Sequence, residues 1–263
     1  MKRIMCNDEL TASVESQREE EEFYRINAVN YKGKTDGGIR YSEVIANMLN
    51  DLEEEKLEEF LKNNSHMGPE KAYPAEPIHK ADEISYAEGS NRNEENIAKR
   101  MMQLGTIREM SGADVNVVDY QVPVNRAGHS HEGKVDLVLD TGSQILLTEL
   151  KDEDSNETLL RAMVEAKTYY TKITDPRIDN DAYKRFVRCY GSKEMRPAVM
   201  IFEGEDSQPW TDFDEMQNGD MPTLRELLIK WHIVIYKVVP KESYTEKTPY
   251  KERQYKLQKI WSE

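Results

Sequence analysis

The chain has 263 residues, of which 33% are charged and 38% are hydrophobic, and its formal net charge is −14. This length predicts one large domain or one domain with an appendage, and no apolar run reaches the roughly 18 residues that a transmembrane helix needs. The N-terminus lacks the apolar segment of a signal peptide, and Cys6 and Cys189 lie far apart, so we expect a reduced, cytoplasmic protein without membrane association.

Acidic residues are concentrated in the first third of the chain. Residues 1–90 contain 11 Lys and Arg against 20 Asp and Glu, a net charge of −9. We expect residues 1–40 to be weakly structured, because a block of like charge and a turn-rich segment occur there. Residues 41–63 instead carry an apolar stripe at helical spacing, which predicts an amphipathic helix. This stripe must pack on the rest of the chain or on a second copy in a homodimer.

From residue 91 onward, helical and strand patterns alternate. Asn93 is expected to cap a helix that ends near Leu104, and Asn156 a helix over about 157–172. A third helix is predicted over 223–230. Alternating or continuous apolar runs predict the strands. These strands cover residues 115–124, 135–139, 145–150, 197–203 and 232–239.

This order predicts an α/β fold in which helices cover both faces of a mixed sheet, over residues 91–240, with a mostly helical N-terminal region. Residues 241–263 form a basic and aromatic extension, and residues 237–260 contain seven basic against three acidic residues. Such a segment can hold single-stranded nucleic acid by charge and stacking. A terminal helix packed on the domain is the equal alternative.

The segment from Gly133 to Lys151 carries the most specific pattern. Two apolar strands flank the turn at residues 140–143, which predicts a β-hairpin. Side chains alternate across a strand, so Glu149 and Lys151 share a face, and Asp136 on the partner strand can lie beside Glu149. Burying two carboxylates and an ammonium among apolar residues is costly unless a cation or a substrate uses them. The pattern therefore indicates a metal-dependent site for phosphodiester chemistry.

Asp136 followed by Glu149-Leu150-Lys151 resembles the motif of the PD-(D/E)XK nuclease superfamily, although Val135 stands where a proline is usual. The resemblance implies a three-layer α/β/α restriction-endonuclease-like core with a mixed central sheet. It also implies that Asp136, Glu149 and the backbone carbonyl of Leu150 bind Mg²⁺, which Mn²⁺ can replace. Hard oxygen ligands suit this ion. Lys151 would orient the attacking water and stabilise charge on the phosphate.

Other polar residues are weaker candidates. Glu94 fits a glutamate that relatives carry on the first helix and could bind metal, although acidic residues favour the first turn of any helix, and Glu95 could replace it. Glu165 and Tyr169 resemble an accessory Gln and Tyr pair of RecB-like members, with Arg161 one turn earlier. We favour ordinary exposed helical positions for these three residues.

Two histidines precede the first strand of the hairpin. His129 and His131 could bind a transition metal, but no third ligand accompanies them, and we favour a plain loop.

The favoured function is a Mg²⁺-dependent nuclease that hydrolyses phosphodiester bonds in nucleic acid, DNA in preference to RNA. The alternative is a catalytically silent protein of the same fold that acts as a binding or regulatory module. Silent members commonly lose the aspartate or the lysine, whereas Asp136, Glu149 and Lys151 are all present.

Overall fold

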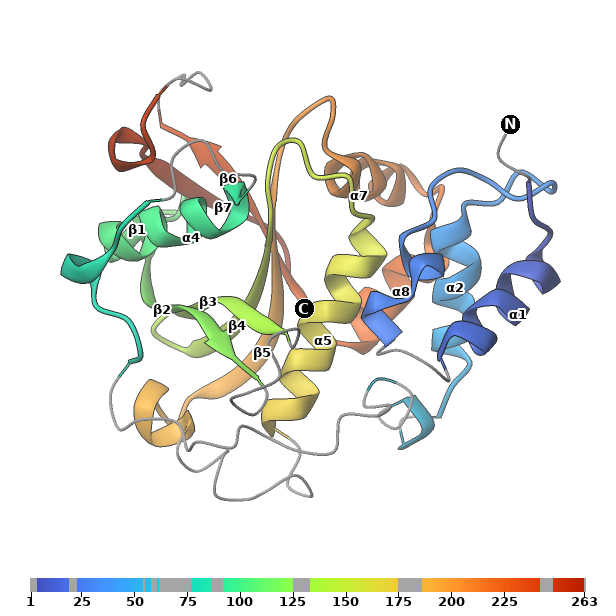
Figure 1. Ribbon diagram of the computed structural model, residues 1–263, viewed down its shortest axis with the longest axis horizontal. Helices are drawn as coiled ribbons and strands as arrows, with labels where there is room; N and C mark the ends of the chain where they lie inside the picture. The colour runs from blue at the N-terminus through green and yellow to red at the C-terminus, as the bar shows by residue number, and fades with distance from the viewer. Residues whose placement is uncertain are drawn as a thin grey trace.

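A computed structural model describes residues 4–18, 23–53, 55–57, 61, 77–86, 92–124, 133–174, 186–241 and 248–262. It is a mixed α/β protein with one seven-stranded sheet. Figure 1 shows helices on both sides of this sheet. The elements in chain order are α1 (Asn7–Arg18), η1 (Phe23–Arg25), η2 (Asn27–Asn30), α2 (Tyr41–Asn50), η3 (Ala81–Glu83), α4 (Asn93–Leu104), β1 (Thr106–Arg108), β2 (Asp114–Pro123), β3 (Lys134–Asp140), β4 (Gln144–Lys151), α5 (Leu159–Thr174), β5 (Glu194–Phe202), α7 (Gln208–Asn218), α8 (Pro222–Lys230), β6 (Val234–Pro240), η4 (Tyr250–Glu252) and β7 (Tyr255–Trp261).

The strands follow one another across the sheet in chain order. The β4–β5 and β5–β6 pairs are parallel, and the other neighbours are antiparallel. The sheet curls until its ends approach, because Glu109 forms a bridge with Leu257 and the amide of Met110 donates to the Leu257 carbonyl at 2.8 Å. The result is a nearly closed, barrel-like sheet with its site-bearing strands in the middle.

Alternation along β4 separates two apolar cores. Ile145 and Leu147 face a core shared with α5 and α8, whereas Leu146 and Leu150 face a core shared with α4. Both faces of the central strands are therefore covered, as the continuous apolar runs predict. The predicted hairpin and the helix over 223–230 are confirmed within a residue or two.

The N-terminal region packs on the α5 and α8 side of the sheet. Leu10, Phe23 and Ile26 are fully buried in the same core as the inner side chains of α5 and α8. The Glu43 carboxylate accepts hydrogen bonds from the amides of Thr223 at 2.6 Å and Leu224 at 3.0 Å. It thereby satisfies free amides at the start of α8. The expectation of weak structure over residues 1–40 is wrong for the ranges described, because α1 and the short helices form part of this core.

The helix predicted over 41–63 is interrupted. The helix α2 ends at Asn50, and among the described residues that follow, 55–57 and 61 are helical again, with Leu57 and Leu61 buried. The Lys230 ammonium donates to the carbonyls of Asn50 at 2.8 Å and Leu52 at 3.1 Å. These carbonyls are therefore satisfied without a continuing helix.

In its described part, the C-terminal segment forms the short helix η4 and then a strand, in place of a packed terminal helix or a free extension. Tyr255–Trp261 forms β7, antiparallel to β6, and Tyr255 and Leu257 face the α4-side core. The strand β1 and the helix α7 are also additions to the predicted order. Within the described ranges, every helix is too short or too polar to span a bilayer.

Candidate active site

The strands β3 and β4 separate where the motif begins. Their ladder ends at the pair of Leu137 and Thr148, one position before Asp136 and Glu149. The amide of Leu150 donates instead to the Asp136 carboxylate at 2.9 Å. In an extended strand the N–H and C=O of one residue point to the same edge, so the Leu150 carbonyl also faces this gap. A carboxylate is thus held between two splayed strands.

A kink in β2 places a second partner on Asp136. Gln121 has φ of 49°, in the left-handed region that side chains other than glycine rarely adopt, and its amide donates to Asp136 at 2.6 Å. Burial raises the pKa of Asp136 to about 6, against the lowering effects of the Lys151 charge and of the Leu150 hydrogen bond. Asp136 is therefore held in place by two hydrogen bonds and retains an unusually high proton affinity.

Lys151 lies at the centre of a buried ionic cluster. Only 3% of its surface is exposed, and its ammonium contacts carboxylate oxygens of Glu149 at 2.9 Å, Glu157 at 2.5 Å and Glu165 at 3.1 Å. Burial alone would lower the pKa of Lys151, but the attraction of these carboxylates raises it well above the usual value. Lys151 is therefore a fixed positive charge.

The Glu149 carboxylate lies on the same face as Lys151, as strand alternation predicts. Burial raises its pKa well above the ordinary value, and repulsion from Asp136 adds to this effect. Its Oε1 accepts from Lys151, whereas Oε2 is buried and has no hydrogen-bond partner among the described residues. A buried carboxylate oxygen without a donor is unusual and is suited to an additional cation.

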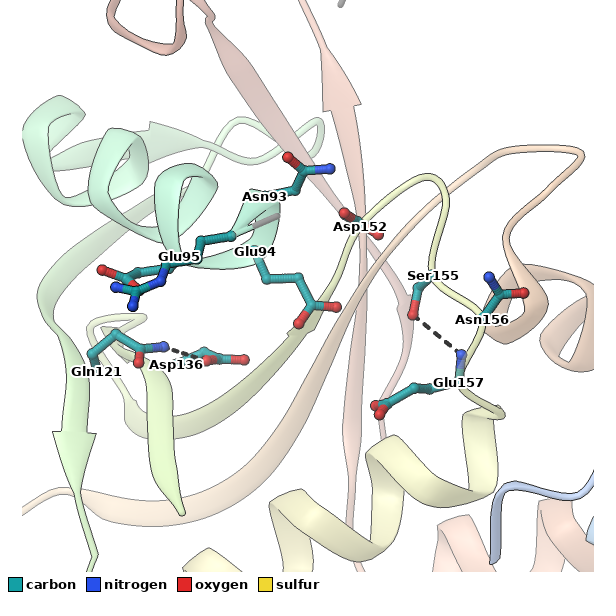
Figure 2. A pocket seen from close by; sticks show the side chains of 10 residues that line it. Asn93, Glu94, Glu95, Gln121, Asp136, Asp152, Ser155, Asn156 and Glu157 are labelled. Atoms are coloured by element: carbon teal, nitrogen blue, oxygen red, sulfur yellow. Dashed lines mark hydrogen bonds and ion pairs between the residues drawn. The ribbon is translucent and has the colours of Figure 1, made fainter. Parts of the chain in front are cut away.

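A cavity of about 420 Å³ opens beside this cluster, between the first turn of α4 and the segment before α5. Figure 2 shows the side chains of Glu94, Asp136 and Glu157 pointing into it. The residues that line the cavity are Arg92, Asn93, Glu94, Glu95, Gln121, Asp136, Asp152, Ser155, Asn156 and Glu157.

The structure distinguishes Glu94 from Glu95 on α4. Burial raises the pKa of Glu94 to about 8, although the Lys151 charge lowers it. Glu95 forms an ion pair with Lys99 at 2.7 Å, and this contact lowers its pKa in spite of burial. Glu94 is therefore the glutamate that the charges of the cluster act on, and burial favours its protonated form, whereas Glu95 is an ionised partner of Lys99.

The three residues on α5 are not ordinary exposed positions, so that interpretation is wrong. Glu165 is buried against Lys151, and Tyr169 is buried in the core. The side chain of Arg161 is 17% exposed and pairs with Glu157 at 3.2 Å and Glu165 at 3.9 Å. Arg161 and Glu165 lie one turn apart on α5, and Glu157 lies just before the helix; Glu157 and Glu165 both contact Lys151, and Arg161 pairs with both of them.

Tyr169 lies against the backbone at the start of the hairpin. A Cβ atom on Gly133 would come within 2.3 Å of the Tyr169 ring. We therefore expect Gly133→Ala to lower the free energy of unfolding by about 1–3 kcal/mol, as overpacking does. Chemical denaturation measures this change. Gly37→Ala is the matched control, because its Cβ would meet its nearest atom at 3.7 Å; equal losses in the two variants would contradict this packing.

Carboxylates outnumber cations in the cluster. Such an excess of buried negative charge is costly unless further cations bind. In the described ranges, no three His, Cys, Asp or Glu side chains form a group that could hold a metal ion as they stand, and the Lys151 ammonium contacts three of the carboxylates. Apart from Glu95, which pairs with Arg92 and Lys99, the carboxylates that line the cavity or contact Lys151 are Glu94, Asp136, Glu149, Asp152, Glu157 and Glu165, and the cations among them are Lys151 and Arg161.

Sequence reasoning missed two residues of the site. Glu157 contacts Lys151, and a signal for it was available, because Glu157, Arg161 and Glu165 are spaced by four residues. Gln121 had no such signal, since its role depends on a backbone kink. His129 and His131 lie outside the described residues, so the structure does not bear on the loop interpretation.

Comparisons of the chain with protein-family models, with curated proteins and with solved structures find no match.

Proposed function

We propose that this protein is a divalent-metal-dependent nuclease that hydrolyses phosphodiester bonds, in DNA in preference to RNA. The observation that carries the proposal is the splayed hairpin, where Asp136, Glu149 and Lys151 form one buried polar cluster at the edge of a cavity. The order α4, β2, β3, β4, α5 and β5 supports the finer proposal of a restriction-endonuclease-like core, because it resembles the order of that family.

The residues present fit a hard divalent cation. Asp136, Glu149 and the Leu150 carbonyl would hold Mg²⁺ or Mn²⁺, with Glu94 as a further oxygen ligand. The free Oε2 of Glu149 and the excess of carboxylates support this assignment. When bound, such an ion lowers the pKa of a water molecule and stabilises charge on a phosphate.

The side chains around the cavity have separate tasks. Lys151 supplies a buried positive charge that can orient a water molecule and stabilise negative charge developing on the phosphate. Glu157 and Glu165 hold the Lys151 ammonium by direct contacts at 2.5 and 3.1 Å. The Gln121 side chain donates to one oxygen of Asp136, and the Leu150 amide donates to the other. The chain therefore positions its reactive groups through contacts that exist before substrate arrives.

Incubation of the purified full chain with linear, circular and single-stranded DNA and with RNA tests the proposal. Each substrate is compared in Mg²⁺, Mn²⁺ and chelator. We expect cleavage that requires a divalent ion and is fastest on one form of DNA. Absence of cleavage on every substrate and in both ions would contradict the proposal and favour the silent binding module.

Metal binding should release protons. The pKa of Glu94, raised to about 8, means that this carboxyl is largely protonated at neutral pH in the metal-free protein, and the pKa of Asp136, raised to about 6, means that Asp136 takes up a proton below about pH 6. A cation binds the deprotonated form, so its affinity should rise as the pH increases from 5.5 to 8.5. Calorimetry in buffers of different ionisation enthalpy measures both the affinity and the protons released. A pH-independent affinity without proton release would place the cation elsewhere.

A further inference from the structure

A loop of the N-terminal region reaches the rim of the acidic cavity. The Lys32 ammonium donates to the Asn156 side chain at 2.9 Å, and Asn156 lines the cavity. Lys32 also belongs to the cations that, against the effect of burial, lower the pKa of Glu157. A positive charge from the first 90 residues therefore lies close to the proposed site.

This loop is fixed to the segment that begins α5. The hydroxyl of Thr158 donates to the Val29 carbonyl at 3.0 Å, and the amide of Thr158 donates to the Asn30 side chain at 2.8 Å. Thr158 is buried directly before α5. The position of Lys32 relative to the cavity thus depends on two buried or half-buried hydrogen bonds, not on a free chain end.

A second hollow, of about 880 Å³, adjoins the loop. Both of its lysines, Lys32 and Lys34, are exposed, and Gly33 between them has φ of 103°, which favours glycine. Lys34 has no carboxylate partner within the described part of the chain, whereas the nearby Arg40 pairs with Glu215. The lining residues are Ile4, Met5, Asn30, Tyr31, Lys32, Gly33, Lys34, Thr35 and Tyr41.

The carboxylates of the cavity repel the phosphates of a nucleic-acid strand, and the positive charges of Lys32 and Lys34 can offset this repulsion. A nucleic-acid strand carries one negative charge per phosphate, and carboxylates repel it unless cations lie along its path. Arg92 lines the cavity from the α4 side, whereas Lys32 and Lys34 lie beyond Asn156 on the α5 side. Cations thus stand on two sides of the cavity in a chain whose net charge is −14.

We propose that residues 31–35 form a phosphate-binding extension of the active site, in which Lys32 and Lys34 hold the backbone of the DNA strand where it leaves the cavity. This inference rests on the proposed nuclease function. Lys32 and Lys34 are positioning residues, because they contact phosphates beside the scissile one and none of the reacting atoms.

The test compares the full chain with the double variant Lys32→Ala/Lys34→Ala. We expect KM for DNA to rise about tenfold, with kcat within about twofold, because the lysines contribute binding and no chemistry. The slope of log affinity against log salt should fall by about 1 for each lysine lost. Lys32→Arg should retain KM. The matched controls are Lys56→Ala and Lys80→Ala, whose side chains are 67% and 65% exposed and which belong to neither hollow.

Two readouts separate this inference from the proposed function. Cleavage by the full chain tests the nuclease function, and binding of labelled DNA to Asp136→Asn, with and without the lysine substitutions, tests the loop. If the full chain cleaves DNA and the double variant has an unchanged KM, the loop lies off the path of the strand. A lower kcat with unchanged KM would also overturn the inference. If no cleavage occurs and the lysine substitutions leave binding unchanged, both proposals are wrong.

Discussion

Asp136→Asn should lower the rate of DNA cleavage by about a thousandfold or more, because it removes a carboxylate that would hold the metal ion. The fold should persist. Asparagine keeps an oxygen that can accept from the Leu150 amide, and its NH2 group can donate to the Gln121 oxygen once the Gln121 side-chain amide turns over. The substitution also removes a carboxylate from a cluster in which carboxylates outnumber cations. We therefore expect an unchanged or higher Tm in the absence of metal, measured by calorimetry alongside the cleavage rate.

The matched control is Asp114→Asn, at the exposed start of β2. Its carboxylate lies 4.0 Å from Arg108, and 60% of its side chain is exposed, so both cleavage and Tm should stay near those of the unchanged chain. Cleavage by Asp136→Asn at more than a tenth of the original rate would exclude Asp136 from the reaction. If Asp136→Asn does not fold, Glu149→Gln tests the same metal site, and we expect the same loss of cleavage in that variant.

Lys151→Met should abolish cleavage and also destabilise the protein by about 3–5 kcal/mol, the usual cost of breaking a buried ion pair by removing one partner. Glu149, Glu157 and Glu165 would lose the ammonium that they share. Methionine has similar length, so the loss measures charge more than volume. Denaturation monitored by circular dichroism gives the free energy of unfolding.

The loss in Lys151→Met should depend on pH and on divalent ions. Carboxyls without a cation have a raised pKa in the folded state, so they contribute stability below that pKa and lose it as the pH rises. The destabilisation should therefore be larger at pH 8.5 than at pH 6, and added Mg²⁺ should recover part of it by binding the folded form. Lys193→Met, which breaks an ion pair of 2.6 Å with Asp140 at the half-exposed hairpin turn, should cost about 1 kcal/mol or less. Equal losses in the two variants would contradict a special role for Lys151.

The sequence predicts the parts of the fold that local patterns determine. The hairpin of β3 and β4 follows from alternation around one turn, and its two strands are adjacent in the chain. At the end of α2, by contrast, a partner from 180 residues away is involved, because the Lys230 ammonium donates to the Asn50 carbonyl. The strand β7 does show alternating apolar residues, but its basic and aromatic composition suggested other interpretations. Both features involve contacts between residues far apart in the chain, which local sequence patterns do not report.

The same division applies to the site. Strand alternation is enough to place Glu149 and Lys151 on one face, and the structure agrees. The burial of Arg161 could not be judged from helical spacing alone, because a stripe of charged residues usually faces solvent. Gln121 reaches Asp136 only through its left-handed backbone, and such strain has no reliable pattern in a single sequence. Local periodicity thus identifies Glu149 and Lys151, whereas the side chains that hold the cluster in place, such as Gln121, are known only from the tertiary structure.

The cap that Glu43 provides for α8 has a consequence for synthesis on the ribosome. The carboxylate and the Thr223 amide that it accepts from are 180 residues apart, so the partner emerges long after Glu43 does. At about 5–20 residues per second, the separation of 180 residues corresponds to between about 9 and 36 s of translation. During this interval the buried residues Ile45, Ala46 and Leu49 of α2 lack the helix α8 on which α2 packs. The nascent chain should therefore depend on chaperones, and slower translation should lower the yield of folded protein.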